Sequence, residues 1–176
     1  MSDPVPSGQT VLVGPRVEIR LVEVAGRAGQ SVPRELVVHP GSVAILPLTD
    51  EGKMVLIRNW RFTVGRELWE LPAGTLEKGE DPQVCAAREL REETGYTART
   101  FRKLGELLIA PAISTERMHA YLATGLTWVG QELDAAERIE SEVLTLERVR
   151  HMLLAGQIED GKTIAVLSLY LLGEDR

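Results

Sequence analysis

The chain lacks the features that mark several large classes of protein. It has one cysteine among 176 residues, which excludes an internal disulfide and suits a reducing cytoplasm. It has no block of lysine and arginine and its net charge is -6, which argues against nucleic acid as a general partner. No apolar run approaches the roughly 20 residues that span a bilayer. The start of the chain lacks the basic and apolar regions of a targeting segment, so we expect a cytoplasmic protein with no membrane partner.

A helix is predicted between Asp81 and Gly95. Asp81 is a natural N-cap, Pro82 suits the first helical turn, and Gly95 suits a left-handed C-terminal position. Small and apolar residues recur at helical spacing and are expected to face inward: Ala86, Ala87, Leu90 and Thr94. The acidic side chains of this helix centre on a different face, so we expect one face to pack and another to present acid to a cleft.

This helix contains three glutamates within a stretch of five residues. Glu89, Glu92 and Glu93 share a face because helical neighbours at i+3 and i+4 project the same way. Crowded carboxylates repel one another unless a hard cation neutralises them, and Mg²⁺ and Mn²⁺ prefer oxygen ligands of this kind. Arg88, four residues before Glu92, is placed to hold the acidic row. The pattern predicts a divalent-metal site of the type that serves phosphate chemistry.

The stretch from Gly74 to Tyr96 resembles the Nudix box, Gly-x5-Glu-x7-Arg-Glu-U-x-Glu-Glu-x-Gly-U, where U is a bulky aliphatic residue. Every fixed position is met, and only Tyr96 departs from the last aliphatic position. The alternative is a solvated, charge-rich helix, which would not account for the box glycines. The resemblance implies a Nudix pyrophosphatase that uses Mg²⁺, with Mn²⁺ as a possible substitute.

The order of predicted elements favours an α+β fold. Strands and helices alternate without regular βαβ order from residue 41 onward. The resemblance implies the same class: an α/β/α sandwich with a mixed sheet over residues 41–176. The expected strands cover 42–48, 54–60, 67–70, 101–109 and 118–124, and the expected late helices cover 147–155 and 162–172.

Residues 1–40 are predicted to form a separate small antiparallel sheet. Residues 17–24 alternate like a strand, 35–39 form another strand, and 25–31 form the turn between them. So small a sheet needs support from the main domain or from a second subunit. The resemblance implies a homodimer with exchanged N-terminal strands, in which Arg20 and Arg34 reach the partner's substrate. The alternative is that both are solvated strand arginines.

The resemblance also implies which residues act at the metal site. In the family, metal ligands come from the first and last glutamates of the Arg-Glu-x-x-Glu-Glu run and from the carbonyl before the box glycine. Here these are Glu89, Glu93 and the carbonyl of Ala73. Glu92 is expected to bind a further ion or to hold a metal-bound water. Arg88 is expected to support the catalytic role of these glutamates.

The general base is expected on a loop after the box, as in related chains. The candidates are Glu137, Glu140 and Glu142, with Glu137 ranked first and Glu140 second. For each of them the alternative is a solvated acidic loop. Glu92 is the remaining candidate, because other Nudix branches use box glutamates as the base.

Three features outside the box resemble the ADP-ribose pyrophosphatase branch of the family. Pro111 lies sixteen residues after Gly95, although a proline there also suits an ordinary loop. The other two features are the runs 66–74 and 123–127. The branch implies hydrolysis of ADP-ribose to AMP and ribose 5-phosphate. The alternatives are another nucleoside diphosphate sugar, such as GDP-mannose, or a sensor that binds ADP-ribose without turnover.

Substrate contacts are expected near the end of the second main-domain strand. Arg61 is expected to clamp a phosphate with its planar guanidinium. Trp60 is a stacking surface for a base or, alternatively, a core aromatic. Glu70, just before the box, is expected to accept a hydrogen bond from the adenine amine or from a neighbouring amide.

Overall fold

The computed structural model describes residues 5–133, 135 and 137–173. The strands are β1 (Gln9–Val13), β2 (Glu18–Ala25), β3 (Ser31–Val38), β4 (Ser42–Pro47), β5 (Met54–Arg61), β6 (Arg66–Glu70), β7 (Ala73–Thr75), β8 (Tyr96–Leu108), β9 (Arg117–Trp128) and β10 (Ile139–Leu144). The helices are α1 (Pro82–Thr94), α2 (Leu146–Leu154) and α3 (Gly161–Gly173). None of these helices is long and apolar enough to cross a membrane.

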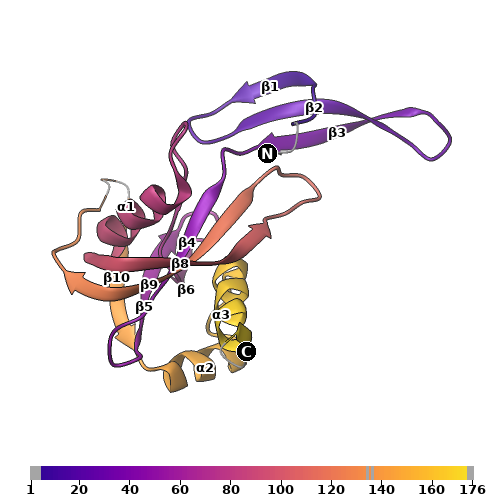
Figure 1. Ribbon diagram of the computed structural model, residues 1–176. Coiled ribbons are helices and arrows are strands. Elements are labelled where there is room, and N and C mark those ends of the chain that lie inside the picture. The colour runs from indigo at the N-terminus through magenta and orange to yellow at the C-terminus, as the bar shows by residue number, and fades with distance from the viewer. Residues whose placement is uncertain (1–4, 134, 136, 174–176) are drawn as a thin grey trace.

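Strand β4 is the centre of the main domain, and all of its residues are buried. Its alternate side chains point to opposite faces. Val43 and Ile45 pack with α1, whereas Ala44 and Leu46 pack with α2 and α3. The strands therefore lie between α1 on one side and α2 and α3 on the other (Figure 1), which confirms the predicted α/β/α sandwich.

The strands of the sandwich form two sheets. One has the order β7-β4-β9-β8, with β4 parallel to β9 and the other pairs antiparallel. The other has the order β10-β5-β6 and is antiparallel throughout. The predicted mixed sheet is confirmed, but β7 and β10 were not predicted. Residues 139–144 were expected in a loop, so the loop placement of Glu140 and Glu142 was wrong.

Helix α1 begins and ends as its sequence predicts. The Asp81 side chain accepts hydrogen bonds from the backbone N–H groups of residues 83 and 84, and Gly95 adopts a left-handed φ of 77°. The predicted inward face was wrong at Ala87, which is exposed, whereas Cys85 is fully buried. The acidic face was not expected to be buried, yet Glu89 and Glu93 are, because α1 packs against β5, β7 and β10 as well as β4.

The N-terminal strands form their own antiparallel sheet in the order β1-β2-β3, which extends from one end of the sandwich (Figure 1). Strand β1 was not predicted, and β3 starts earlier than expected. The sheet joins the β8–β9 connection through backbone bonds: Val37 N–H donates to the Ile113 carbonyl at 2.7 Å, and Thr115 N–H donates to the Val37 carbonyl at 3.0 Å. Val22 is its one buried hydrophobic residue among those described.

The contact between α1 and the sheet makes a testable prediction about stability. Leu90→Ala removes a fully buried side chain from the layer between α1 and β4, and we expect it to lower the free energy of unfolding by about 2–5 kcal/mol. The matched change Leu154→Ala removes a side chain that is 91% exposed and should alter it by less than about 0.5 kcal/mol. Urea unfolding followed by circular dichroism measures both, and equal effects would contradict this packing.

Candidate active site

A cleft of about 640 Å³ lies beside α1, at the ends of β4, β5 and β7. Its lining is strongly charged and contains six glutamates and four cations. The glutamates are Glu77, Glu89, Glu92, Glu93, Glu116 and Glu137, and the cations are Arg16, Arg61, Arg88 and Lys162. Trp60 and Phe62 add two aromatic rings to its wall. Carboxylates, cations and aromatic rings together suit an anionic ligand with a ring system.

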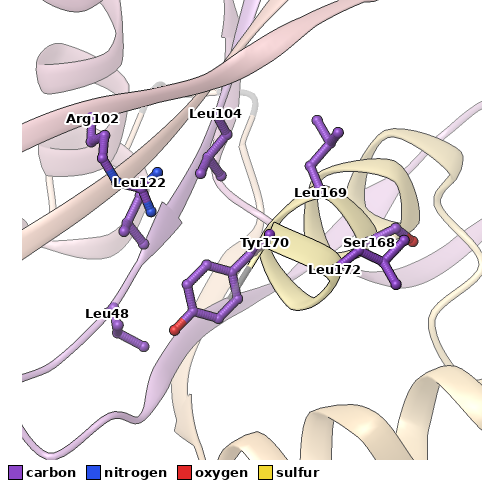
Figure 2. Close-up of a pocket in the computed structure, with 9 residues that line it drawn as sticks. Leu48, Arg102, Leu104, Leu122, Ser168, Leu169, Tyr170 and Leu172 are labelled. Atoms are coloured by element: carbon purple, nitrogen blue, oxygen red, sulfur yellow. The ribbon is translucent and has the colours of Figure 1, made fainter. Parts of the chain in front are cut away.

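A second cavity of about 650 Å³ has a different chemical character. It lies between the sheet and α3, where Tyr170 points toward Leu48 and Leu122 (Figure 2). Among the described residues that line this cavity, Arg102 is charged and none carries a carboxylate. This cavity cannot supply the acidic ligands of a hard cation, so the cleft beside α1 is the candidate active site.

The box glycine lets the Glu89 carboxylate lie directly against the backbone, and a side chain at this position would displace that carboxylate. A Cβ atom on Gly74 would lie 1.9 Å from Cδ and from Oε1 of Glu89. One residue earlier, the Ala73 N–H donates to Oε2 of Glu93 at 2.8 Å. Strand β7 thus approaches α1 closely enough to place the Ala73–Gly74 backbone beside two buried carboxylates. The spacing between the box glycine and the box glutamates produces this contact.

Arg88 connects the glutamates of the box. Its guanidinium donates to Glu80 at 3.0 and 3.1 Å, to Glu89 at 2.6 Å and to Glu92 at 3.1 Å. The hydrogen bond from Arg88 lowers the pKa of Glu80 to about 2. Glu80 therefore holds the loop before the helix, and Arg88 provides the positive charge beside Glu89 and Glu92.

Burial leaves two glutamates of this cluster short of compensating charge. It raises the pKa of Glu93 to about 8, and the nearby charges of Glu89 and Glu137 act in the same direction. Burial also raises the pKa of Glu89, against the opposing effect of Arg88. Among the described residues no three acidic, histidine or cysteine side chains converge on one point in this arrangement. The oxygen donors and their uncompensated burial nevertheless fit a hard divalent cation.

A second ionic group is centred on Glu70 and contributes Arg61 and Lys162 to the lining of the cleft. The side chain of Glu70 is 1% exposed and accepts two hydrogen bonds from Arg61, from Nε at 2.7 Å and from Nη2 at 2.5 Å. Lys162 donates to the same carboxylate at 2.6 Å and pairs with Asp160 at 2.8 Å. Glu70 lies behind Arg61 and is not among the residues that line the cleft.

The structure brings together most of the residues predicted for the site. Those lining the cleft are Trp60, Arg61, Ala73, Arg88, Glu89, Glu92, Glu93 and Glu137. Glu140 is not among them, since it lies on β10 opposite Arg58 and forms an ion pair with it. Pro111 lies in the exposed β8–β9 connection. Arg20 pairs with Glu18 on β2, and Arg34 is exposed on β3.

Several lining residues were missed from the sequence. Arg16 comes from the connection between β1 and β2, Glu116 from the β8–β9 connection, and Lys162 from the start of α3. They lie far from the box along the chain, and no local spacing indicates that they meet it. Phe62 had a weaker signal: it is an aromatic residue two positions after Trp60, but it lies just beyond the end of β5.

The buried carboxyl of Glu93 makes a prediction about pH for the protein without divalent cations. From its ordinary value of 4.5 up to about 8, the carboxyl is ionised in the unfolded chain and protonated in the folded one. This group therefore lowers folding stability as pH rises through that range, by up to about 1.4 kcal/mol per pH unit. We expect Glu93→Gln to gain stability over the wild type as pH rises from 5 to 8. Parallel stability curves would contradict this, and Glu142→Gln, an exposed change on β10, is the control.

Several known proteins are similar in sequence to this chain. The chain is 36% identical over 168 residues to an ADP-ribose pyrophosphatase of Bacillus subtilis (strain 168), covering 94% of this chain and 91% of the relative. It is 35% identical to a methanol dehydrogenase activator of Bacillus methanolicus, with the same shares covered. It is 34% identical to a GDP-mannose pyrophosphatase of Escherichia coli (strain K12), covering 73% and 71%.

The fold has a close match among solved structures. The crystal structure of an ADP compounds hydrolase superposes with a TM-score of 0.82 at 23% identity, covering 96% of this chain and 93% of that one. The family model described as the NUDIX domain matches residues 38–167, which include the whole box and every lining residue of the cleft except Arg16. The chain belongs to the NUDIX domain family.

Proposed function

We propose that this protein is a Nudix pyrophosphatase that hydrolyses ADP-ribose to AMP and ribose 5-phosphate with Mg²⁺. The observation that carries the proposal is the pair of buried carboxylates, Glu89 and Glu93, beside the Ala73–Gly74 backbone in a cleft that is also lined by cations. The full-length similarity to an ADP-ribose pyrophosphatase supports the choice of substrate. The complete box argues against the alternative of a sensor without turnover.

Nudix hydrolases generally use divalent metal ions, and the residues present suit Mg²⁺, with Mn²⁺ as a substitute. Glu89, Glu93 and the Ala73 carbonyl would hold the ion, and Glu92 would hold a further ion or its water. When bound, the ion would neutralise charge on the diphosphate and help to position the attacking water. Arg88 already balances Glu89 and Glu92, so it keeps the acidic row in place as ligands arrive.

The chain's own side chains would bind and orient the substrate. Arg61 presents its guanidinium to the cleft while Glu70 fixes its plane from behind, which suits a phosphate clamp. Trp60, 43% exposed, and Phe62, 87% exposed, offer ring faces to a base or a ribose. Because Glu70 is fully occupied by cations, the role that fits it is to orient Arg61 and not to accept a bond from adenine.

Glu137 is the residue that we propose as the general base. It lines the cleft, and its charge acts on both Glu89 and Glu93, so it lies near the acidic cluster. Glu140 is exposed, paired with Arg58 and outside the lining residues, so its position does not suit proton transfer in the cleft. Glu92 is the alternative within the box.

The rival substrate is another nucleoside diphosphate sugar such as GDP-mannose, because a relative of that name shares the fold over most of its length. The same cleft would hold the diphosphate, and the base and sugar would differ.

We also propose that the protein is a cytoplasmic homodimer, in which residues 1–40 form the dimerising strands and residues 41–176 form the hydrolase domain. Its exchanged N-terminal strands would bring Arg20 and Arg34 to the partner's substrate. The single cysteine, which is buried, suits a reducing compartment.

The substrate prediction is tested with a panel of ADP-ribose, GDP-mannose and UDP-glucose, incubated with the protein and Mg²⁺ and analysed for products by chromatography. We expect the highest kcat/KM for ADP-ribose, with AMP and ribose 5-phosphate as products and no turnover after chelation by EDTA. A higher kcat/KM for GDP-mannose would select the rival substrate. Binding of ADP-ribose without consumption would select the sensor.

The assignment of the base is tested by Glu137→Gln and Glu140→Gln. We expect Glu137→Gln to lower kcat about 10²–10⁴-fold, the range for losing a general base, without weakening Mg²⁺ binding measured by calorimetry. Glu140→Gln should stay near wild type because that carboxylate faces Arg58 outside the cleft. The reverse pattern would make Glu140 the base, and two near-normal variants would move the role to Glu92.

A further inference from the structure

We propose that Lys162 is a second substrate-binding cation, placed beside Arg61 by the buried carboxylate of Glu70, so that the two bind the diphosphate together. This inference rests on the proposed function and specifies how the diphosphate is held. It assigns Glu70 as a positioning residue that contacts no substrate. The contributing elements are β5, β6 and the first turn of α3.

Besides a bound metal ion, the cleft offers cations other than Arg88 to a diphosphate. Six of the lining residues are glutamates, and a diphosphate brings more negative charge. Arg88 is already engaged by Glu80, Glu89 and Glu92. The lining cations that remain are Arg16, Arg61 and Lys162. Arg16 is exposed on the β1–β2 connection, whereas Arg61 and Lys162 are held by a buried group.

Glu70 places the two cations side by side. Its Oε2 atom accepts from Arg61 Nη2 at 2.5 Å and from Lys162 Nζ at 2.6 Å. Because this carboxylate is 1% exposed, it is shielded from water, and its ion pairs hold the two cations side by side before substrate arrives. Such preorganisation lowers the entropy cost of binding an anion.

Both cations keep donors for a ligand. A guanidinium has five N–H groups, and Glu70 accepts from two of those of Arg61. An ammonium has three, and Lys162 is partnered by Glu70 and Asp160. Both residues line the cleft, so the donors left over have an open space in which to meet phosphate oxygens.

The start of α3 is fixed to the segment that leads into the box. The hydroxyl of Thr163 accepts from the Leu71 N–H at 2.8 Å and donates to Asp160 at 2.6 Å. Asp160 also accepts from the Thr163 N–H at 2.9 Å. Leu71 follows Glu70 directly and precedes Ala73 by two residues. These hydrogen bonds therefore fix the position of Lys162 relative to the Ala73 backbone, which adjoins Glu93.

The test measures steady-state kinetics with ADP-ribose and Mg²⁺ for Lys162→Met. We expect KM to rise about 10–100-fold, the range for losing a charge-assisted hydrogen bond, while kcat changes less than about threefold. The Ki of ADP, which carries the same diphosphate, should rise in parallel. Lys162→Arg restores a cation and should recover most of the KM.

The matched control is Lys103→Met. Lys103 is an ion-paired lysine as well, bonded to Glu106 at 2.5 Å, but it lies on β8 and is not among the lining residues of the cleft. The change in net charge is the same as in Lys162→Met, and we expect KM and Ki to stay at wild-type values. A rise equal to that of Lys162→Met would overturn the proposal, because it would reflect only the overall charge.

Glu70→Gln tests the positioning role, since it keeps the shape but removes the charge that gathers both cations. We expect KM to rise in this variant, and to rise much less when Lys162→Met is already present, because both changes act on one network. Additive effects would overturn the positioning role. A folded Lys162→Met protein with unchanged KM would overturn the proposal alone, whereas a wild type that consumes no nucleoside diphosphate sugar would overturn the proposed function.

Discussion

The structure depends on the burial of two carboxylates, Glu89 and Glu93, against the backbone of β7. Burying negative charge costs free energy unless it is paired or neutralised. The protein meets part of that cost with the Ala73 N–H and with Arg88. The remainder appears as the raised pKa of both carboxyls. A site held in this state gains stability when a cation arrives, so the same burial that weakens the metal-free fold favours cation binding.

Two ionic clusters contribute to the cleft. In the first, carboxylates of the box surround Arg88, and in the second, Arg61 and Lys162 surround Glu70. Hydrogen bonds fix the side chains of both clusters, because Arg88 joins the members of the first and the buried Glu70 joins those of the second. A diphosphate in this cleft would meet hard cations held by the first cluster and the guanidinium and ammonium donors of the second.

The sequence was most informative about features that depend only on residues close together along the chain. The caps of α1 at Asp81 and Gly95 were predicted because capping depends on neighbouring residues. Strand β4 was predicted because a run buried on both faces is continuously apolar. Strand β10 was missed because three of its four exposed residues are charged or polar, with Val143 as the fourth, and because the strand is fixed by pairing with β5. Ala87 was misplaced because periodicity alone does not show where the neighbouring strands lie.

By itself, the sequence determined the α+β class, the box helix and the set of acidic residues, since each follows from spacing within about twenty residues. Tertiary structure decided which of those acids are buried, that Glu137 lines the cleft while Glu140 faces away, and that Lys162 lies beside Arg61. Burial and ion pairing depend on which distant segments pack together. A carboxylate has the same appearance in a sequence whether it faces water or a buried cation, and only the packed neighbours distinguish the two.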